Sequence, residues 1–554
     1  MTQLKIKFRK CKSKKSAVDK LKEYAAKTKH TLFTNEIETN EGIVLKRLQS
    51  TIKNSYVLSD ATRRTFDQLI MLMHLGIWSK HGLEDPRRNK TQRPKLKIQA
   101  GDIKEKFLVD ASIQVDNASI VFQTRDEFDR FQEAYSQYEK YYQQNDKCAF
   151  AINILELYNA IAEQDMNRYT ALPTWLHRYT PAYIYVEILD DGVDELKKKK
   201  KYKIALTILN TLISQVVFLQ HCKAEWYEKK ANILVTQFKE HVKAGSALIE
   251  GLKADLPPET KQILKIYANR IAQNEYIPNE LKKELQELSK DTVKDMSKDF
   301  DKNLFKGYKV NVKMWAEHES DKSGEGPESY CINQYIKTQP KGQVFTNGKH
   351  WQGDMITTMF FLFFSDIIYT KPIATAGIFM GHYQRYPLDM FSESFYTNRK
   401  QMIDNELKRI VEMPIEDILK VIEERWRKEL EHEKNDISRK VEWKHMAVVL
   451  RCLGSQGIAV ICRRLARDFG YCYWGFPDIT LWNEQTNQVK FVEVKTVDRP
   501  SVKQLQWLHY LKSNDIDVAI CKLRSATGSV GAYDDEADET EQSDNDAVDL
   551  DCYS

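Results

Sequence analysis

Two carboxylates and an ammonium group stand near the C-terminal end of the sequence, at Asp478, Glu493 and Lys495. Residues 490–495 alternate like a strand, so Glu493 and Lys495 project to one face, and Asp478, at the start of the partner segment, can reach the same point. Two carboxylates hold a hard divalent cation, which lowers the pKa of a bound water and neutralises charge on a reacting phosphate. The lysine orients or deprotonates that water and offsets phosphate charge. This spacing predicts a Mg²⁺- or Mn²⁺-dependent phosphodiesterase.

The elements expected around these residues suit such a site. The sequence predicts strands over 478–482 and 490–495, a polar turn over 483–488 and a helix over 502–511. A glutamate and a lysine that share one face of an apolar hairpin need a reason to be there, which favours a catalytic site. The same letters also occur by chance in a chain this rich in Asp, Glu and Lys. A structural hairpin with solvent-facing ion pairs is therefore the alternative.

Length and composition limit the class of protein. The 554 residues, 42% apolar and 29% charged, predict two to four packed units. The most apolar window, Met355–Tyr369, is too short to span a bilayer and contains Asp366, so we expect a buried helix and no membrane partner. The nine cysteines include no C-x-x-C pair, which predicts reduced thiols rather than a zinc site.

The charge distribution is uneven. The stretch 534–551 contains ten acidic residues, and setting it aside raises the net charge from +5 to +15. A basic body suits a polyanionic partner, because lysine and arginine set against phosphates release counterions. Solvated basic faces are the alternative. The residues from 525 onward predict a disordered acidic tail.

The chain divides by pattern into five predicted regions. An N-terminal mixed region, 1–145, includes a helix from the apolar face of 61–78 and a strand over 113–122. Amphipathic helices over 146–300 predict a helical-repeat domain. A helical lead-in over 301–440, a nuclease core over 441–524 and the tail 525–554 follow. The expected fold class is α/β with helices predominating.

Several motifs are more specific than these patterns. They are R-R-L-A-R-D-F (463–469), G-F-P-D-I-T-L-W-N (475–483), V-E-V-K (492–495), K-Q-L-Q-W-L (503–508), Y-T-P-A-Y-I-Y-V-E-I-L (179–189), S-D-I-I-Y (365–369) and Y-P-L-D-M-F-S-E-S-F-Y-T-N-R (386–399). Those after residue 460 resemble the VRR-NUC domain of the PD-(D/E)xK nucleases. The chain as a whole resembles the Fanconi-associated nuclease 1 family, from about residue 15 to 523. The family's ubiquitin-binding zinc finger has no counterpart, and residues 1–145 contain only part of its SAP-like DNA-binding segment.

The resemblance implies a TPR-like helical-repeat domain followed by a restriction-endonuclease-like core. It also implies a nuclear, structure-selective DNA nuclease, active on 5′ flaps and as a 5′→3′ exonuclease in interstrand crosslink repair. By the same resemblance the metal ligands are Asp478, Glu493 and the carbonyl of Val494, with Lys495 catalytic. Lys503 and Arg499 match basic residues near DNA phosphates, and Lys229, Lys230 and Arg270 are candidates for a pocket that holds a 5′ phosphate.

One position departs from the family pattern. The family has a fourth acidic ligand where this chain has Gln352, which keeps a carbonyl oxygen but carries no charge. Asp354 could take over as ligand, although we expect it to be the N-cap of the following helix. A catalytically weakened protein that binds branched DNA is therefore the alternative function. A third hypothesis is a scaffold for repair proteins that uses the acidic tail. Self-association on DNA is left open.

Overall fold

The structure, a computed structural model, describes residues 59–73, 75 and 115–526, with gaps at 145, 294–299, 312, 322, 373–374, 382–383, 385, 432–437, 439 and 497–498. The chain divides into two compact units, Met1–Met71 and Leu72–Ser554. Helix α3 (Asp60–Met73) confirms the helix expected from the apolar pattern over 61–78. Residues 1–58 and 527–554, which include all of the predicted acidic tail except residues 525 and 526, lie outside the described residues.

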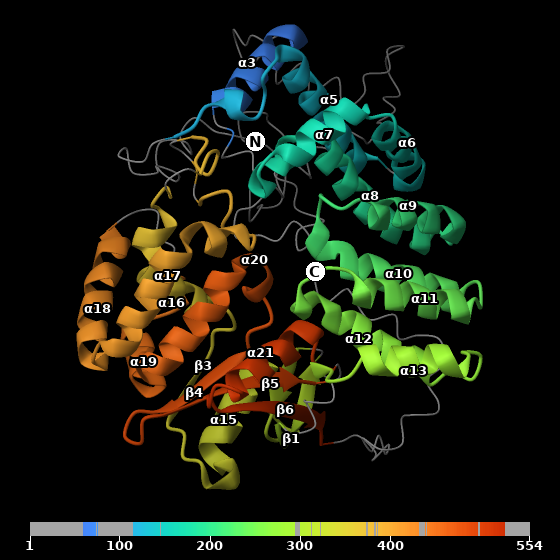
Figure 1. Ribbon diagram of the computed structural model, residues 1–554. Coiled ribbons are helices and arrows are strands. Elements are labelled where there is room, and N and C mark those ends of the chain that lie inside the picture. Colours follow the sequence, from blue (N-terminus) through green and yellow to red (C-terminus); the bar gives the residue numbers. More distant parts are fainter. Residues whose placement is uncertain are drawn as a thin grey trace, which may run out of the picture. The chain divides into compact units, whose positions relative to one another are not determined.

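Paired antiparallel helices fill the region between residues 125 and 288 (Figure 1). They are α5 (Arg125–Gln143), α6 (Lys147–Asn159), α7 (Glu163–Ala171), α8 (Pro181–Lys198), α9 (Tyr202–Ser214), α10 (Lys223–Thr236), α11 (His241–Lys253), α12 (Pro258–Ala272) and α13 (Asn279–Leu288). A capping box between Thr124 and Glu127 begins α5, and Asp146 caps α6. Each helix from α9 to α13 packs against the helix that precedes it, so the expected helical-repeat domain is confirmed.

The strand predicted over 113–122 is wrong for its described part. Residues 118–120 form a single 3₁₀ turn. The carboxamide oxygen of Asn117 accepts the N–H of Ser119 at 3.0 Å, which closes the turn locally. Local side-chain capping of this kind competes with strand formation, and the alternating pattern gives no sign of it.

A six-stranded mixed sheet organises the C-terminal half of the chain. Its strands are β1 (Asp301–Asn311), β2 (Met314–Ala316), β3 (Asn347–His350), β4 (Ile479–Asn483), β5 (Gln488–Lys495) and β6 (Val518–Ser525), in the order β2-β1-β6-β5-β4-β3. Strand β6 runs parallel to both β1 and β5, and the other pairs are antiparallel. The region 301–440, expected to be a helical lead-in, therefore supplies three strands of this sheet, and that expectation is incomplete.

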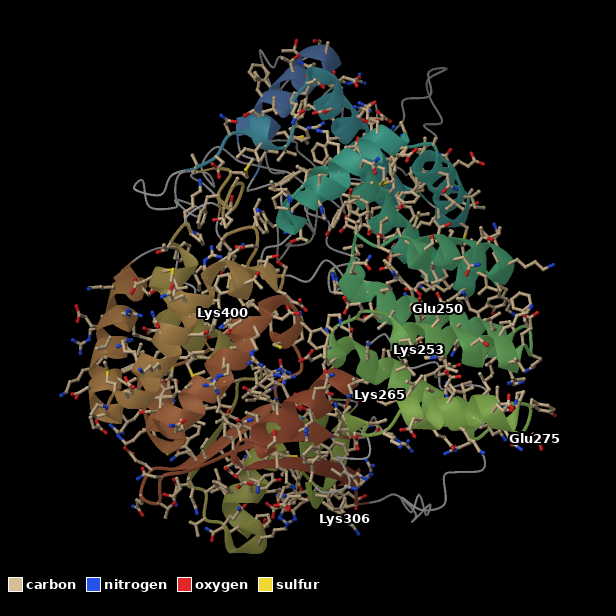
Figure 2. All side chains as sticks on the ribbon, in the orientation of Figure 1. Glu250, Lys253, Lys265, Glu275, Lys306 and Lys400 are labelled. Atoms are coloured by element: carbon tan, nitrogen blue, oxygen red, sulfur yellow. The ribbon has the colours of Figure 1, made fainter. Side chains whose placement is uncertain are left out.

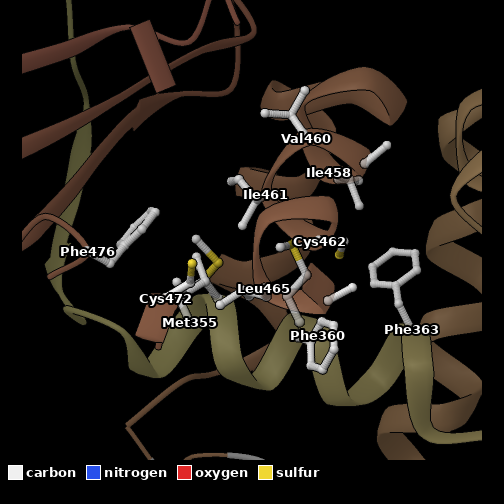
Figure 3. Close-up of a cluster of buried hydrophobic side chains, with 14 of the residues drawn as sticks. Met355, Phe360, Phe363, Ile458, Val460, Ile461, Cys462, Leu465, Cys472 and Phe476 are labelled. Carbon is white, nitrogen blue, oxygen red and sulfur yellow. The ribbon is translucent and has the colours of Figure 1, made fainter. Parts of the chain in front are cut away.

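Helices cover the sheet on two sides. Helix α15 (Pro327–Thr338) packs on one face, over Val492, Val494 and the other residues of that core cluster. The second face is covered by α16 (Asp354–Ile368), α19 (Trp443–Arg467), α20 (Phe469–Cys472) and α21 (Val502–Lys512), with α17 (Ser394–Glu412) and α18 (Ile415–Glu431) outside them. Figure 3 shows Phe360 and Phe363 of α16 packed against α19. The apolar window 355–369 is thus a buried helix, as predicted.

Helix α19 is long and apolar enough to cross a membrane by length and composition alone. It bends at Gly454, whose φ is 66°, and the apolar residues 458–462, 465 and 466 of its second half lie in the core beside α16. It therefore packs as a core helix. The seven cysteines in the described part of the chain are all free thiols.

Candidate active site

The strand pair β4–β5 sets the positions of the predicted catalytic residues. Ile479 pairs with Val492, so Asp478 precedes the first paired residue of β4 and lies beside the end of β5. Phe491 packs in the core on the face covered by α19 and α21, whereas Val492 packs under α15. Because side chains alternate along a strand, Glu493 and Lys495 share the face of Phe491. The predicted arrangement of the two side chains is therefore present.

Glu493 is the centre of the site. Its side chain is fully buried, and its Oε1 accepts hydrogen bonds from the Lys495 ammonium, at 3.0 Å, and from the Gln504 amide. Its Oε2 is buried and has no hydrogen-bond partner. Burial and the neighbouring Asp478 carboxylate raise the pKa of Glu493, and Lys495 opposes that shift. A buried carboxylate oxygen without a partner is costly unless a cation or a proton satisfies it.

Backbone geometry aims a carbonyl at the same point. The N–H of Phe491 donates to Asp517 on the β6 side, so odd-numbered residues of β5 bond toward β6 and even-numbered ones toward β4. Strand β4 ends before it reaches Val494, and the Val494 N–H donates instead to Asp478 Oδ2 at 2.9 Å. Since the N–H and C=O of one strand residue point to the same side, the Val494 carbonyl is also directed toward Asp478.

Gln352 lies directly beside Asp478. It has a left-handed backbone with φ of 49°, and its N–H donates to the Asp478 carbonyl at 3.1 Å. Its side-chain amide nitrogen is 3.4 Å from Asp478 Oδ1. The position predicted for a fourth ligand therefore belongs to the site.

Asp354 does not take the role expected for it. Gly353 precedes α16 without a side-chain cap, and Asp354 is the first helical residue. Its carboxylate pairs with Lys440 at 2.8 Å. The predicted N-cap is wrong, because this ion pair holds the carboxylate.

These groups fit a divalent cation. The oxygens of Asp478, Glu493, Gln352 and Val494 are the donor type that hard cations take, and the unpartnered Glu493 Oε2 needs a positive neighbour besides Lys495. The fit rests on two carboxylates, one carbonyl and one amide. Gln352 would supply no charge.

Gln504 is the residue that sequence reasoning missed. It is the N3 residue that closes the capping box at the start of α21: its Oε1 accepts the Ser501 N–H at 2.8 Å, while its Nε2 donates to Glu493. Gly475, with φ of +87°, lets the loop before Asp478 approach α21, since an added Cβ would lie 2.9 Å from Lys503. The sequence signal for this residue is the S-x-x-Q spacing of Ser501 and Gln504, which predicts a capping box at the start of the helix after the strand.

The basic residues expected near DNA lie in two places. Lys503 is in the first turn of α21, with its ammonium 4.7 Å from the centre of the Tyr471 ring, and Arg499 is exposed in the preceding loop. Helices α20 and α21 also contact the helical repeats, because Tyr471 of α20 and Gln506 of α21 both donate to the carbonyl of Glu259. The phosphate contacts of Lys503 and Arg499 stay predictions.

The three candidates for the phosphate pocket are not equivalent. Lys229 is 4% exposed, and its ammonium lies 3.2 Å from Asp194 and 3.7 Å from Asp190. It neutralises two carboxylates of α8, so this geometry does not favour phosphate binding by Lys229. Arg270 is exposed and stacks on Tyr267 at 4.4 Å, and Lys230 is half-buried on α10. A pocket that includes these two stays a prediction.

Comparison with known proteins agrees with the fold and the strand pair. The model of the VRR-NUC domain matches residues 417–525, and that of the TPR domain of Fanconi-associated nuclease 1 matches residues 139–269. The fold and the site thus define a VRR-NUC protein with a TPR-type helical domain.

Individual relatives agree with both matches. Fanconi-associated nuclease 1 of Danio rerio is 27% identical over 385 residues, which cover 66% of this chain and 38% of that protein. The Homo sapiens protein is 27% identical over 360 residues, covering 63% and 35%. A crystal structure of paFAN1 bound to DNA with a 1-nucleotide 5′ flap and a gap shares the fold, with a TM-score of 0.59 at 14% identity over 93% of this chain and 82% of that one. This chain belongs to the Fanconi-associated nuclease 1 family, and the aligned part spans just over a third of these two curated relatives.

Proposed function

We propose that this chain is a metal-dependent, structure-selective DNA nuclease that cuts 5′ flaps and degrades DNA 5′→3′, acting in interstrand crosslink repair in the nucleus. The observation that carries the proposal is Glu493: a buried carboxylate with one oxygen held by Lys495 and Gln504, and the other unpartnered and next to Asp478. Family membership and a relative solved with 5′-flap DNA support the choice of substrate.

The residues of the site divide the chemistry among them. Asp478 and Glu493 would hold Mg²⁺ or Mn²⁺ together with the Val494 carbonyl, and a cation there supplies Lewis-acid activation and neutralises phosphate charge. The Lys495 ammonium, 3.0 Å from Glu493, positions the attacking water and offsets the charge that develops on the phosphate. Gln504 keeps the Glu493 carboxylate in one orientation through its amide.

The test compares three variants on a 5′-flap substrate with Mg²⁺ or Mn²⁺. Asp478→Asn keeps an oxygen for the Val494 N–H but loses the charge, and Lys495→Ala removes the ammonium. Lys309→Ala, an exposed lysine of β1 on the sheet face opposite Glu493, is the matched control. We expect both site variants to lose cleavage while the control cuts like wild type. Equal rates in all four proteins, or no cleavage by wild type with either metal, would refute catalysis by this site.

A second function is favoured by Gln352 beside Asp478. With an amide in place of a charge, this chain would bind branched DNA while cutting it slowly or not at all. That alternative predicts flap binding with a steep salt dependence and no product. Gln352→Glu separates the two functions: a large gain in cleavage supports the weakened site, and an unchanged rate in an active wild type contradicts it.

A further inference from the structure

The catalytic face of the sheet continues beyond Lys495. Strand register aligns Glu493 with Ile520 of β6, and Ile520 with Lys302 of β1. The next row on the same face joins Lys495, Lys522 and Leu304. In the row after that, Arg524 pairs with Lys306, which Figure 2 labels. Cross-strand partners of this kind lie about 4.8 Å apart.

Four cations on this face form what we call the basic tract: Lys302, Lys306, Lys522 and Arg524. Lys302, Lys306 and Arg524 are exposed, and Lys522 is half-buried. Arg524 also donates to the carbonyl of Thr496, the residue after Lys495, and this hydrogen bond joins the tract to the end of β5. Within β1, β5 and β6, Glu493 is the one acidic side chain on this face.

Protection of an exposed strand edge explains only part of the tract. Strand β2 pairs with β1 from Tyr308 onward, so no strand of the described part of the chain pairs with this side of residues 301–307, and lysines there discourage pairing with another chain. Lys522 and Arg524, however, lie on β6, which has a strand on each side. Edge protection therefore does not account for these two, and a set of cations that spans both strands presents positive charge to a polyanion.

Apolar side chains alternate with the cations along β1. Leu304 is 58% exposed between Lys302 and Lys306, and half-buried Tyr308 follows on the same face. A flat surface with cations for phosphates and apolar side chains for base faces suits a single strand of nucleic acid better than a duplex.

We propose that the basic tract binds the phosphates of single-stranded DNA continuing from the scissile phosphate, with Leu304 and Tyr308 against its bases. This rests on the proposed nuclease function and adds the path of the unpaired strand across β6 and β1.

The test measures binding of the full chain to a fluorescent single-stranded oligonucleotide and to a blunt duplex, in EDTA so that nothing is cleaved. Lys302→Gln/Lys306→Gln removes two charges from the tract. The matched control is Lys309→Gln/Lys313→Gln: both lysines are exposed, and Lys309 lies toward the Trp315 ring on the other face of β1. Circular dichroism melts check that both variants fold.

For the single strand, we expect the slope of log affinity against log salt to fall by about 1.4 in the tract variant, or about 0.7 for each phosphate that no longer meets a lysine. The control should keep the wild-type slope, and the duplex slope should change little in either variant. If the single-strand slopes of the two variants are equal, the basic tract does not bind the phosphates of the single strand. If the duplex slope of the tract variant falls as much as its single-strand slope, the tract does not prefer single strands. Wild type that neither binds nor cuts DNA would instead count against the proposed function.

Discussion

Replacing Gln352 by glutamate gives the sharpest test of the metal site. The amide nitrogen of Gln352 is 3.4 Å from Asp478 Oδ1, so Gln352→Glu places two carboxylates in near contact. Two charges about 4 Å apart interact by about 1 kcal/mol in water and about 4 kcal/mol at an effective dielectric constant of 20. Because Gln352 is exposed, the lower value applies. Without metal, we expect the variant to lose about 1 kcal/mol of unfolding free energy.

When a divalent cation is bound, the added carboxylate should stabilise the site instead of destabilising it. A third carboxylate that contributes about 1.4 kcal/mol to binding lowers the Kd about tenfold. Titration calorimetry with Mn²⁺ measures this change, and thermal melts in EDTA measure the repulsion. Gln401→Glu, the same substitution at an exposed position of α17, is the control and should change neither quantity.

Two results would contradict this reasoning. If Gln352→Glu melts lower in EDTA yet binds Mn²⁺ with wild-type affinity, its side chain lies beside Asp478 but is no ligand. If neither quantity changes, the close approach of residue 352 to Asp478 is wrong.

Three further predictions concern the support of the site. Gln504→Ala should lower the free energy of unfolding by about 1–3 kcal/mol, because Glu493 loses a hydrogen-bond donor and α21 loses its capping box. Denaturant unfolding that shows no such loss would contradict the contact between Gln504 and Glu493. Gly475→Ala should lower the free energy of unfolding by about 1–3 kcal/mol, because the backbone φ is +87° and the added Cβ would contact Lys503. An unchanged midpoint of urea unfolding would exclude this strain. Burial raises the pKa of Asp468 to about 6, so its ionisation destabilises the fold as pH rises from about 4 through 6, by at most about 3 kcal/mol. Asp468→Asn keeps an acceptor for the Tyr471 N–H, so its melting temperature should exceed that of wild type at pH 8 and equal it at pH 4. Equal melting temperatures at both pH values would refute the raised pKa of Asp468.

The local parts of the site could be predicted from the sequence. The two-residue period of β5 is enough to place Glu493 and Lys495 on one face, and the turn before it brings in Asp478. The place of Gln352 follows from family resemblance alone, since no local pattern joins it to a strand that begins over a hundred residues later.

Non-local contacts account for what the sequence does not reveal. Strand β1 falls within the predicted helical lead-in because one of its faces is exposed and basic, and this obscures the alternation that Phe305 on the buried face would otherwise reveal. Lys229 has the pattern of a surface cation because its partners, Asp190 and Asp194, belong to another helix. A charge pattern within one helix does not show which helix packs against it.

The parallel pairing of β1 with β6 affects how the chain is made. Asp301 pairs with Ala519, so β1 waits for its neighbour while the ribosome adds everything between them, about 10–45 seconds at 5–20 residues per second. During that interval its hydrogen-bonding edge is open to other chains. A fragment limited to residues 417–525 would leave the corresponding edge of β6 open permanently, and we expect such a fragment to aggregate unless residues 301–311 are supplied with it.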